Sequence, residues 1–176
     1  MTVPGTFDTS ARELIHAGLQ NLDEARSLFR QLSASGFDAA RCGLLLDALQ
    51  HVCDPDVALR NLVDIVNAQV SQGRALDDIM PDDTAFRQLV AVLGVSDAMG
   101  KLMRFRPDLV QAAATDHCNS HLYNHDQRRA HVLESVGADP NDRMSPTATM
   151  DLADAATALR RTYRNQLAAI IAQDTM

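Results

Sequence analysis

Apolar residues recur along this chain at three- and four-residue intervals, the spacing that places them on one face of an α-helix. In the first half of the chain this pattern predicts successive helices over about 11–20, 23–36, 38–54 and 54–72. A further helix is expected from Asp83, with a break at Gly94 and a restart at Ser96 that lasts until Pro107. Every clear element has the helical period, so the sequence predicts an all-α fold in the form of an irregular multi-helix bundle.

Polar residues stand where the predicted helices begin. Ser10 and Glu13 have the spacing of a capping box, in which the two residues satisfy each other's free backbone N–H groups. Aspartates are expected to cap the next three helices, at Asp23, Asp38 and Asp54. Single glycines such as Gly36 and Gly137 follow the apolar runs and are typical helix stops.

The second half of the chain ends in one long predicted helix. The pattern weakens over 115–123, a short helix is expected over 127–136, and the stretch 137–146 has the Gly and Pro content of a loop. The residues that follow predict a helix over about 148–173, roughly 39 Å long at 1.5 Å per residue. Because this helix reaches the last residues without a cap or stop signal, we expect the chain to be cut from a longer protein.

These patterns divide the chain into four expected parts. They are a disordered N-terminus, a helical body, a linker and a long helix leading into a missing domain, over 1–8, 9–136, 137–146 and 147–176. The long helix carries an apolar stripe that includes Leu159, Tyr163, Leu167 and Ile170. If that stripe serves a missing domain, it should be uncovered in the chain alone.

Composition narrows the possible partners. Aromatic residues make up 4% of the chain and Trp is absent, so the core must consist of aliphatic side chains. The formal net charge is −7, with 16 Lys and Arg against 23 Asp and Glu, which disfavours nucleic acid and anionic membranes as partners. No apolar run approaches the length of a membrane span and no signal peptide is recognisable, so we expect a cytoplasmic protein.

Cysteine and histidine residues offer the most enzyme-like chemistry in the chain. His117, Cys118, His121 and His125 combine imidazole and thiol groups at near-helical spacing, which suits zinc. Asparagines interrupt this segment and no CxxC or HExxH pattern is present, so solvated or capping histidines are favoured. The cysteines at 42 and 53 are expected to be reduced, and buried on the same helix.

Arginines form the other candidate surface. On the long helix, Arg160, Arg161 and Arg164 lie beside Tyr163 and are expected either to be solvated or to dock an acidic partner domain. The groups at 104–106 and 128–129 are interpreted as surface charge. No Gly-rich phosphate-binding loop occurs in the sequence.

Two long motifs resemble one enzyme family. Residues 86–100 (FRQLVAVLGVSDAMG), followed by Arg-Pro-Asp at 106–108, and residues 159–167 (LRRTYRNQL), followed by Ala-Gln-Asp, are similar to segments of bacterial glutamine-synthetase adenylyltransferases. Residues 133–140 (LESVGADP) and 54–63 (DPDVALRNLV) resemble the actinobacterial branch.

This resemblance implies a bifunctional, cytoplasmic enzyme of nitrogen control. Such enzymes transfer AMP from ATP to a tyrosine of glutamine synthetase and remove it by phosphorolysis. They use two magnesium-dependent nucleotidyltransferase domains and a nitrogen-signalling regulatory protein as partner. Their catalytic signature, Gly-x-Ser-Asp-x-Asp, has no match here, so no catalytic, cofactor-binding or metal residue is assigned.

The sequence therefore predicts the N-terminal helical segment of such an enzyme, truncated before its first nucleotidyltransferase domain. We expect this segment to be a scaffold, inactive alone, which docks that domain through Arg160, Tyr163, Arg164 and Asp174. It would also help to place glutamine synthetase. The alternatives are a free-standing helical protein-interaction module and, less favoured, a small metalloprotein built on the His and Cys cluster.

Overall fold

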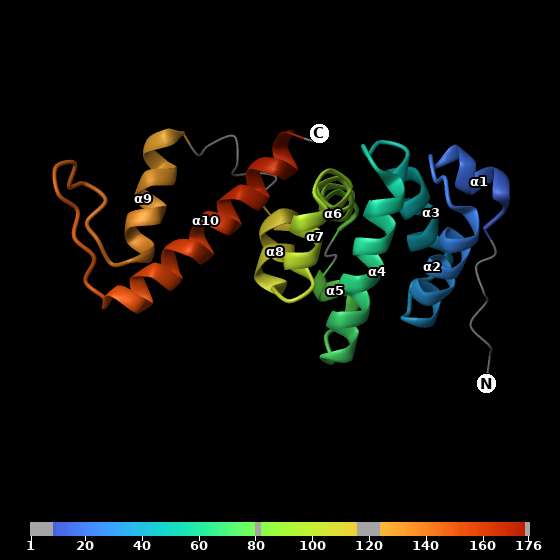
Figure 1. The fold of residues 1–176 in the computed structure, drawn as a ribbon, viewed down its shortest axis with the longest axis horizontal. Helices are drawn as coiled ribbons and strands as arrows, with labels where there is room; N and C mark the ends of the chain where they lie inside the picture. The colour runs from blue at the N-terminus through green and yellow to red at the C-terminus, as the bar shows by residue number, and fades with distance from the viewer. Residues whose placement is uncertain (1–8, 80–81, 116–123, 175–176) are drawn as a thin grey trace.

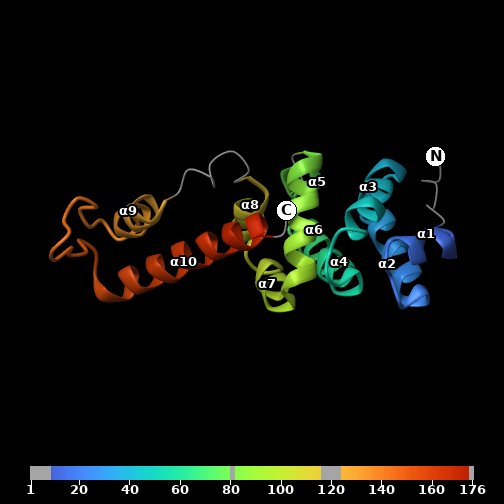
Figure 2. The ribbon, with the colours of Figure 1, turned by 90° about the horizontal axis from the view of Figure 1, so that it is seen from above.

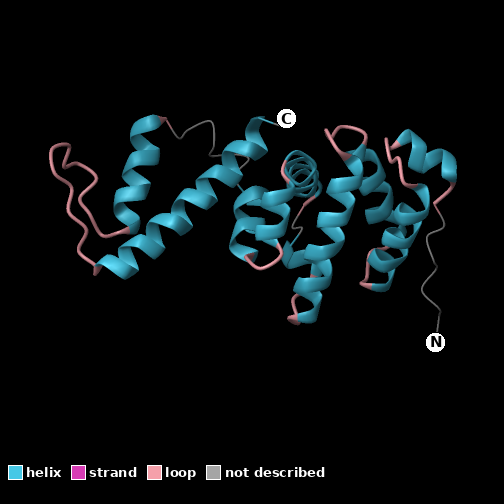
Figure 3. Cartoon of the chain, viewed as in Figure 1, coloured by secondary structure: helices cyan, strands magenta, loops and turns pink. Residues whose placement is uncertain are grey.

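The computed structural model describes residues 9–79, 82–115 and 124–174 of the chain. All regular secondary structure within these residues is helical (Figure 3). This confirms the all-α class that the spacing of apolar residues predicts.

The helices follow one another along the chain with short connections, except for the segment between α9 and α10. Their bounds are α1 Ala11–His16, α2 Leu22–Ala34, α3 Ala39–Leu49, α4 Pro55–Ser71, α5 Leu76–Ile79, α6 Asp83–Val95, α7 Asp97–Met103, α8 Pro107–Thr115, α9 His125–Ser135 and α10 Leu152–Asp174. None of these described helices combines the length and apolar character needed to cross a bilayer.

The molecule is elongated, and its helices progress from α1 at one end to α9 at the other, with α10 returning from α9 toward the middle (Figures 1 and 2). α1, α2 and α3 form one end, and α4 packs between them and α6. α9 lies at the far end, and α10 runs from α9 back to α6 and α8. The long helix therefore joins the two ends of the second half of the molecule.

Two hydrophobic cores of very different size hold these helices. The main core extends from α1 to α8 and includes the fully buried side chains Leu14, Phe29, Leu45, Leu62, Leu89 and Leu109. α10 joins it through Ala168, which is fully buried. A small second core of Val136, Ala138 and Ala155 joins the start of α10 to the end of α9. Burial of apolar surface is thus concentrated in the first two thirds of the chain.

Local capping explains where most helices begin. The Ser10–Glu13 capping box is present, with the Ser10 N–H donating to Glu13 Oε2 at 2.8 Å. Asp38 and Asp54 cap α3 and α4 by accepting from backbone N–H groups three residues on. These three N-termini confirm the sequence-based prediction.

The predicted cap at Asp23 is wrong, because α2 begins two residues earlier. Asn21 is the N-cap and its side chain accepts from the Glu24 N–H at 3.3 Å. The carboxylate of Asp56 in α4 accepts from the backbone N–H groups of Gln20 and Asn21, at 3.0 and 3.3 Å. This tertiary contact fixes the connection between α1 and α2 and moves the start of α2.

The third helix ends at Leu49 instead of continuing to Asp54. The intervening residues turn the chain toward α4, and the Val52 side chain lies against Gly94 of α6. Cys42 is buried as expected, and burial raises the pKa of its thiol. Cys53 is outside the helix and exposed, so its predicted burial is wrong.

The predicted break between two helices is present, but it falls at Ser96 instead of Gly94, since α6 continues through this glycine to Val95. A Cβ at Gly94 would lie 2.9 Å from the Cβ of Val52, closer than real contacts allow. Glycine is therefore used here for close packing and not as a helix stop. Ser96 begins α7 as predicted, accepting from the Met99 N–H at 3.2 Å.

The long helix begins at Leu152, four residues later than predicted. Asp151 precedes it and accepts from the Ala153 and Asp154 N–H groups at 2.9 and 3.0 Å. Before that point, the Thr149 N–H donates to the Val136 carbonyl at 3.2 Å, which holds the chain outside the helix. The segment between α9 and α10 is thus anchored at both ends.

Arg129 of α9 also binds this segment. Its guanidinium donates to the carbonyl oxygens of Pro140 and Asp142, at 3.0 and 2.8 Å. The interpretation of Arg129 as plain surface charge is therefore wrong, because its donors satisfy loop carbonyls. The proposed linker over 137–146 is held close to α9 by this side chain.

Candidate docking groove between α8 and α10

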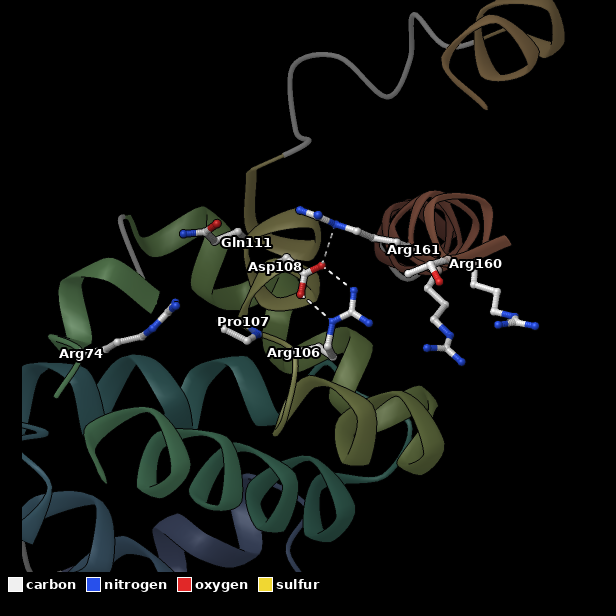
Figure 4. Close-up of a pocket in the computed structure, with 9 residues that line it drawn as sticks. Arg74, Arg106, Pro107, Asp108, Gln111, Arg160 and Arg161 are labelled. Carbon is white, nitrogen blue, oxygen red and sulfur yellow. Dashed lines mark hydrogen bonds and ion pairs between the residues drawn. The ribbon is translucent and has the colours of Figure 1, made fainter. Parts of the chain in front are cut away.

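A groove of about 740 Å³ lies where α10 crosses the start of α8 (Figure 4). Its lining is rich in arginine and contains few apolar side chains. The lining residues are Arg74, Arg106, Pro107, Asp108, Gln111, Thr157, Arg160, Arg161 and Arg164.

Three separate elements bring these arginines together. In α10, residues 157, 160, 161 and 164 are three or four positions apart, so they share one helical face. Arg106 comes directly before α8, which begins with Pro107. Arg74 follows Gly73, whose φ of +77° turns the chain after α4. The groove is therefore a product of tertiary packing.

Asp108 lies at the centre of the groove and binds two of the arginines (Figure 4). Arg106 binds it in a bidentate manner, with Nε and Nη2 at 2.9 and 2.7 Å from the two carboxylate oxygens. Arg161 Nε is 3.5 Å from Oδ2. The hydrogen bonds from Arg106 hold the pKa of Asp108 below its ordinary value and raise the pKa of Arg106.

The other arginines of the groove have no such partner. Within the described residues, no carboxylate lies within ion-pair distance of Arg74, Arg160 or Arg164. The lining of the groove includes five arginines and a single carboxylate residue, Asp108. The groove is thus a local excess of positive charge on a chain whose net charge is −7.

Replacing Asp108 by asparagine is expected to lower the free energy of unfolding by about 1 kcal/mol at pH 7. Because the pKa of Asp108 is lowered in the folded state, its stabilising effect is present above the ordinary carboxyl pKa of about 3.9. It is lost as the pH falls through the lowered folded-state pKa. Urea unfolding at several pH values should show the difference between wild type and D108N shrinking toward about pH 2; a pH-independent difference would contradict the assignment.

No family model and no solved structure matches the chain. The chain is 62% identical over 170 residues to the bifunctional glutamine synthetase adenylyltransferase/adenylyl-removing enzyme of Bifidobacterium longum, covering 97% of this chain and 16% of that protein. The enzyme of the same name from Corynebacterium efficiens is 33% identical over 162 residues, or 74% of this chain and 15% of the relative.

The chain corresponds to the N-terminal part of this enzyme family. It spans about one sixth of the length of these relatives. The family resemblance that the motifs at 86–100 and 159–167 indicate is thereby confirmed.

Two of the predicted docking residues, Arg160 and Arg164, line the groove, and Tyr163 comes between them in the sequence. Tyr163 is 65% exposed and Leu159 40% exposed, so the part of the stripe near them is uncovered. Leu167 packs against the main core instead. Arg160 is exposed and Arg164 half-buried. Asp174 is the last residue of α10, and its side chain lies outside the described part of the structure.

The histidine and cysteine cluster falls mostly outside the described residues. This applies to His117, Cys118 and His121. His125 is the first residue of α9, and its side chain is 93% exposed. In the part of the chain that is described, no three His, Cys, Asp or Glu side chains are grouped so that they could hold a metal ion.

Sequence reasoning missed two arginines of the groove. Arg106 was interpreted as surface charge, but it is only 32% exposed and is held by Asp108. Arg74 belongs to no motif or charge group in the sequence. The Arg-Pro-Asp spacing at 106–108 was the available signal. A carboxylate two residues after an arginine, at the start of a helix, can accept hydrogen bonds from that arginine.

Proposed function

We propose that this chain is the N-terminal helical scaffold of a bifunctional glutamine synthetase adenylyltransferase/adenylyl-removing enzyme. Identity of 62% over almost the whole chain supports this proposal. The whole protein would transfer AMP from ATP to a tyrosine of glutamine synthetase and remove it by phosphorolysis. The catalytic residues, ATP and magnesium would belong to parts of the protein beyond this chain.

The proposed role of the chain is to dock the neighbouring nucleotidyltransferase domain. The observation that carries this proposal is the uncovered edge of α10, where Leu159 and Tyr163 are exposed beside Arg160 and Arg164. Tyrosine and arginine are enriched among the residues that dominate protein interfaces. A long helix with an open apolar edge needs a partner to exclude water from that edge.

Glutamine synthetase is the proposed substrate of the whole enzyme, and a nitrogen-signalling protein its proposed regulator. With these partners, the proposed location of the protein is the cytoplasm. The chain alone, mixed with ATP, magnesium and glutamine synthetase, is expected to show no AMP transfer, because it contains no Gly-x-Ser-Asp-x-Asp signature.

The first test is the reading frame beyond codon 176. A Gly-x-Ser-Asp-x-Asp motif several tens of residues further on would support the proposal. A stop codon directly after Met176 would contradict it and would favour the free-standing interaction module.

Hydroxyl-radical footprinting then tests the docking edge. We expect Tyr163 to be modified readily in the 176-residue chain, where it is 65% exposed, and about tenfold more slowly in the whole protein, because an interface excludes water from its anchor residues. Ile15 of α1 is a matched control, since it is 61% exposed and lies at the other end of the molecule. Equal modification of Tyr163 in the chain and in the whole protein would overturn the docking role.

A further inference from the structure

We propose that the arginine groove between α8 and α10 binds a multivalent phosphate compound, either a nucleoside polyphosphate or an inorganic polyphosphate. The site consists of Arg74, Arg106 and Arg161 together with Arg160 and Arg164. The docking role rests on the exposed Leu159 and Tyr163 of α10 and shares Arg160 and Arg164 with this site. Arg74 and Arg161 belong to the phosphate site alone, so variants at these two positions test it independently of docking.

Charge is the first argument. Most described arginines outside the groove that form ion pairs do so one to one, as Arg41 does with Asp77 and Arg87 with Asp47. Five arginines line the groove, only Arg106 and Arg161 pair with its one carboxylate, Asp108, and the other three have no carboxylate within ion-pair distance among the described residues. Holding like charges together in the absence of a ligand costs free energy, and a multivalent anion would remove that cost. The chain as a whole has a net charge of −7, so anions are attracted to this local positive site and repelled by the rest of the surface.

The arrangement of the guanidinium groups is the second argument. Figure 4 shows Arg74 on one side of Pro107, and Arg106 with Arg161 on the other. Arginines from three elements that are distant in sequence thus line one groove. This geometry can surround a compact anion, whereas a row of arginines along a flat helix face could not.

Asp108 contributes to this geometry by orienting two donors. Its bidentate pair with Arg106, at 2.9 and 2.7 Å, and its contact with Arg161 at 3.5 Å reduce the freedom of both side chains. Arginine forks match the spacing of phosphate oxygens, so oriented guanidinium groups favour phosphate over monovalent anions. Asp108 is thus a positioning residue of the proposed site.

The size and lining of the groove favour a small ligand over an acidic protein segment. Its volume of about 740 Å³ lies within the range of small-molecule sites, roughly 300–1,000 Å³. Pro107 is the one wholly apolar residue of the lining. A peptide that binds in a groove usually inserts side chains into apolar pockets or pairs with a strand edge, and the described lining offers neither.

Calorimetric titration of the 176-residue chain tests the site, with sodium tripolyphosphate and ATP as separate probes in magnesium-free buffer at pH 7.5. We expect saturable binding of one anion per chain. Arg74→Gln and Arg161→Gln should each weaken it by about tenfold, as expected for loss of one charge-assisted contact. Arg12→Gln, an exposed arginine on α1, is the matched control and should leave the affinity unchanged. Circular dichroism confirms that each variant is folded.

The two probes distinguish the sources of the phosphate. Equal affinity for both compounds supports recognition of the phosphate chain alone, and tighter binding of ATP supports a nucleotide ligand. Three results would overturn the proposal. The first is that neither probe binds saturably. The second is that R74Q and R161Q bind the probes as tightly as wild type, and the third is that an oligoglutamate peptide binds under conditions where tripolyphosphate does not.

Discussion

Replacing Leu89 by alanine is expected to lower the free energy of unfolding by about 2–5 kcal/mol, the largest loss we predict for a single substitution. Leu89 is fully buried in the main core and belongs to α6. α6 packs against α3, α4, α7, α8 and α10, so it is the central helix of the molecule. The closely packed neighbours cannot all move into the cavity, and the lost contacts are not replaced.

Urea unfolding followed by the helical circular-dichroism signal measures this effect. Leu152→Ala is the matched control, because it removes the same atoms from a side chain that is 87% exposed at the start of α10. We expect its effect to stay within about 0.5 kcal/mol. Equal losses for L89A and L152A would contradict the placement of α6 at the centre of the core.

The helices of the body were predictable because their signals are local. The apolar residues of α4 and α6 recur at the helical period, and Asp38 and Asp54 cap their helices within three residues of sequence. Side chains so close in sequence meet whatever the rest of the fold does. The same locality explains the capping box at Ser10 and Glu13.

The errors at helix ends have tertiary causes. Gly94 has the sequence character of a helix stop, yet it lies inside α6, where Val52 from another part of the chain occupies the space that a side chain would need. The start of α2 depends on Asp56, which lies 35 residues after Asn21. Thr149 is held outside α10 by Val136. None of these contacts leaves a periodic signal in the sequence.

The long helix shows how side-chain size misleads an analysis of burial. Three of its large apolar residues, Leu152, Leu159 and Tyr163, are exposed, whereas the small Ala155 and Ala168 are buried. Small side chains allow a helix to approach its neighbours closely, and on the contact face of α10 the buried Ala168 lies between Leu167 and Ile171, which pack partly buried against the main core. The large residues on the other side then form an open edge, which is the basis of the proposed docking.

Only the α10 part of the arginine groove could be predicted from the sequence. Arg160 and Arg164 stand out because they flank Tyr163 on one helix. Arg74 and Arg106 join them only because α10 crosses the start of α8, and this crossing depends on Ala168 and the main core. Sequence spacing predicts which residues share a helix face, but the sum of charges from three elements requires the fold.

Gly100→Ala is the second substitution for which we expect a large loss, about 2–4 kcal/mol of unfolding free energy. A Cβ at Gly100 in α7 would lie 2.4 Å from Cγ of Asn61 in α4. Asn61 is 5% exposed, and its Nδ2 donates to the Leu93 carbonyl at 3.4 Å. The added methyl group must therefore displace a buried amide from its partner, and this cost exceeds the gain of about 1 kcal/mol from replacing glycine within a helix.

Gly43→Ala separates the steric effect from this helix-propensity gain. Gly43 lies inside α3, and nothing lies within 4 Å of the position that a Cβ would take. Here we expect a gain of about 0.5–1 kcal/mol, because alanine loses less backbone entropy than glycine on folding. The two variants carry the same chemical change and should move the thermal midpoint in opposite directions. A stabilising G100A would contradict the close approach of α7 to α4 at Gly100 and Asn61. Because α7 also packs against α8, that result would bear on the position of α8 and of the groove at its start.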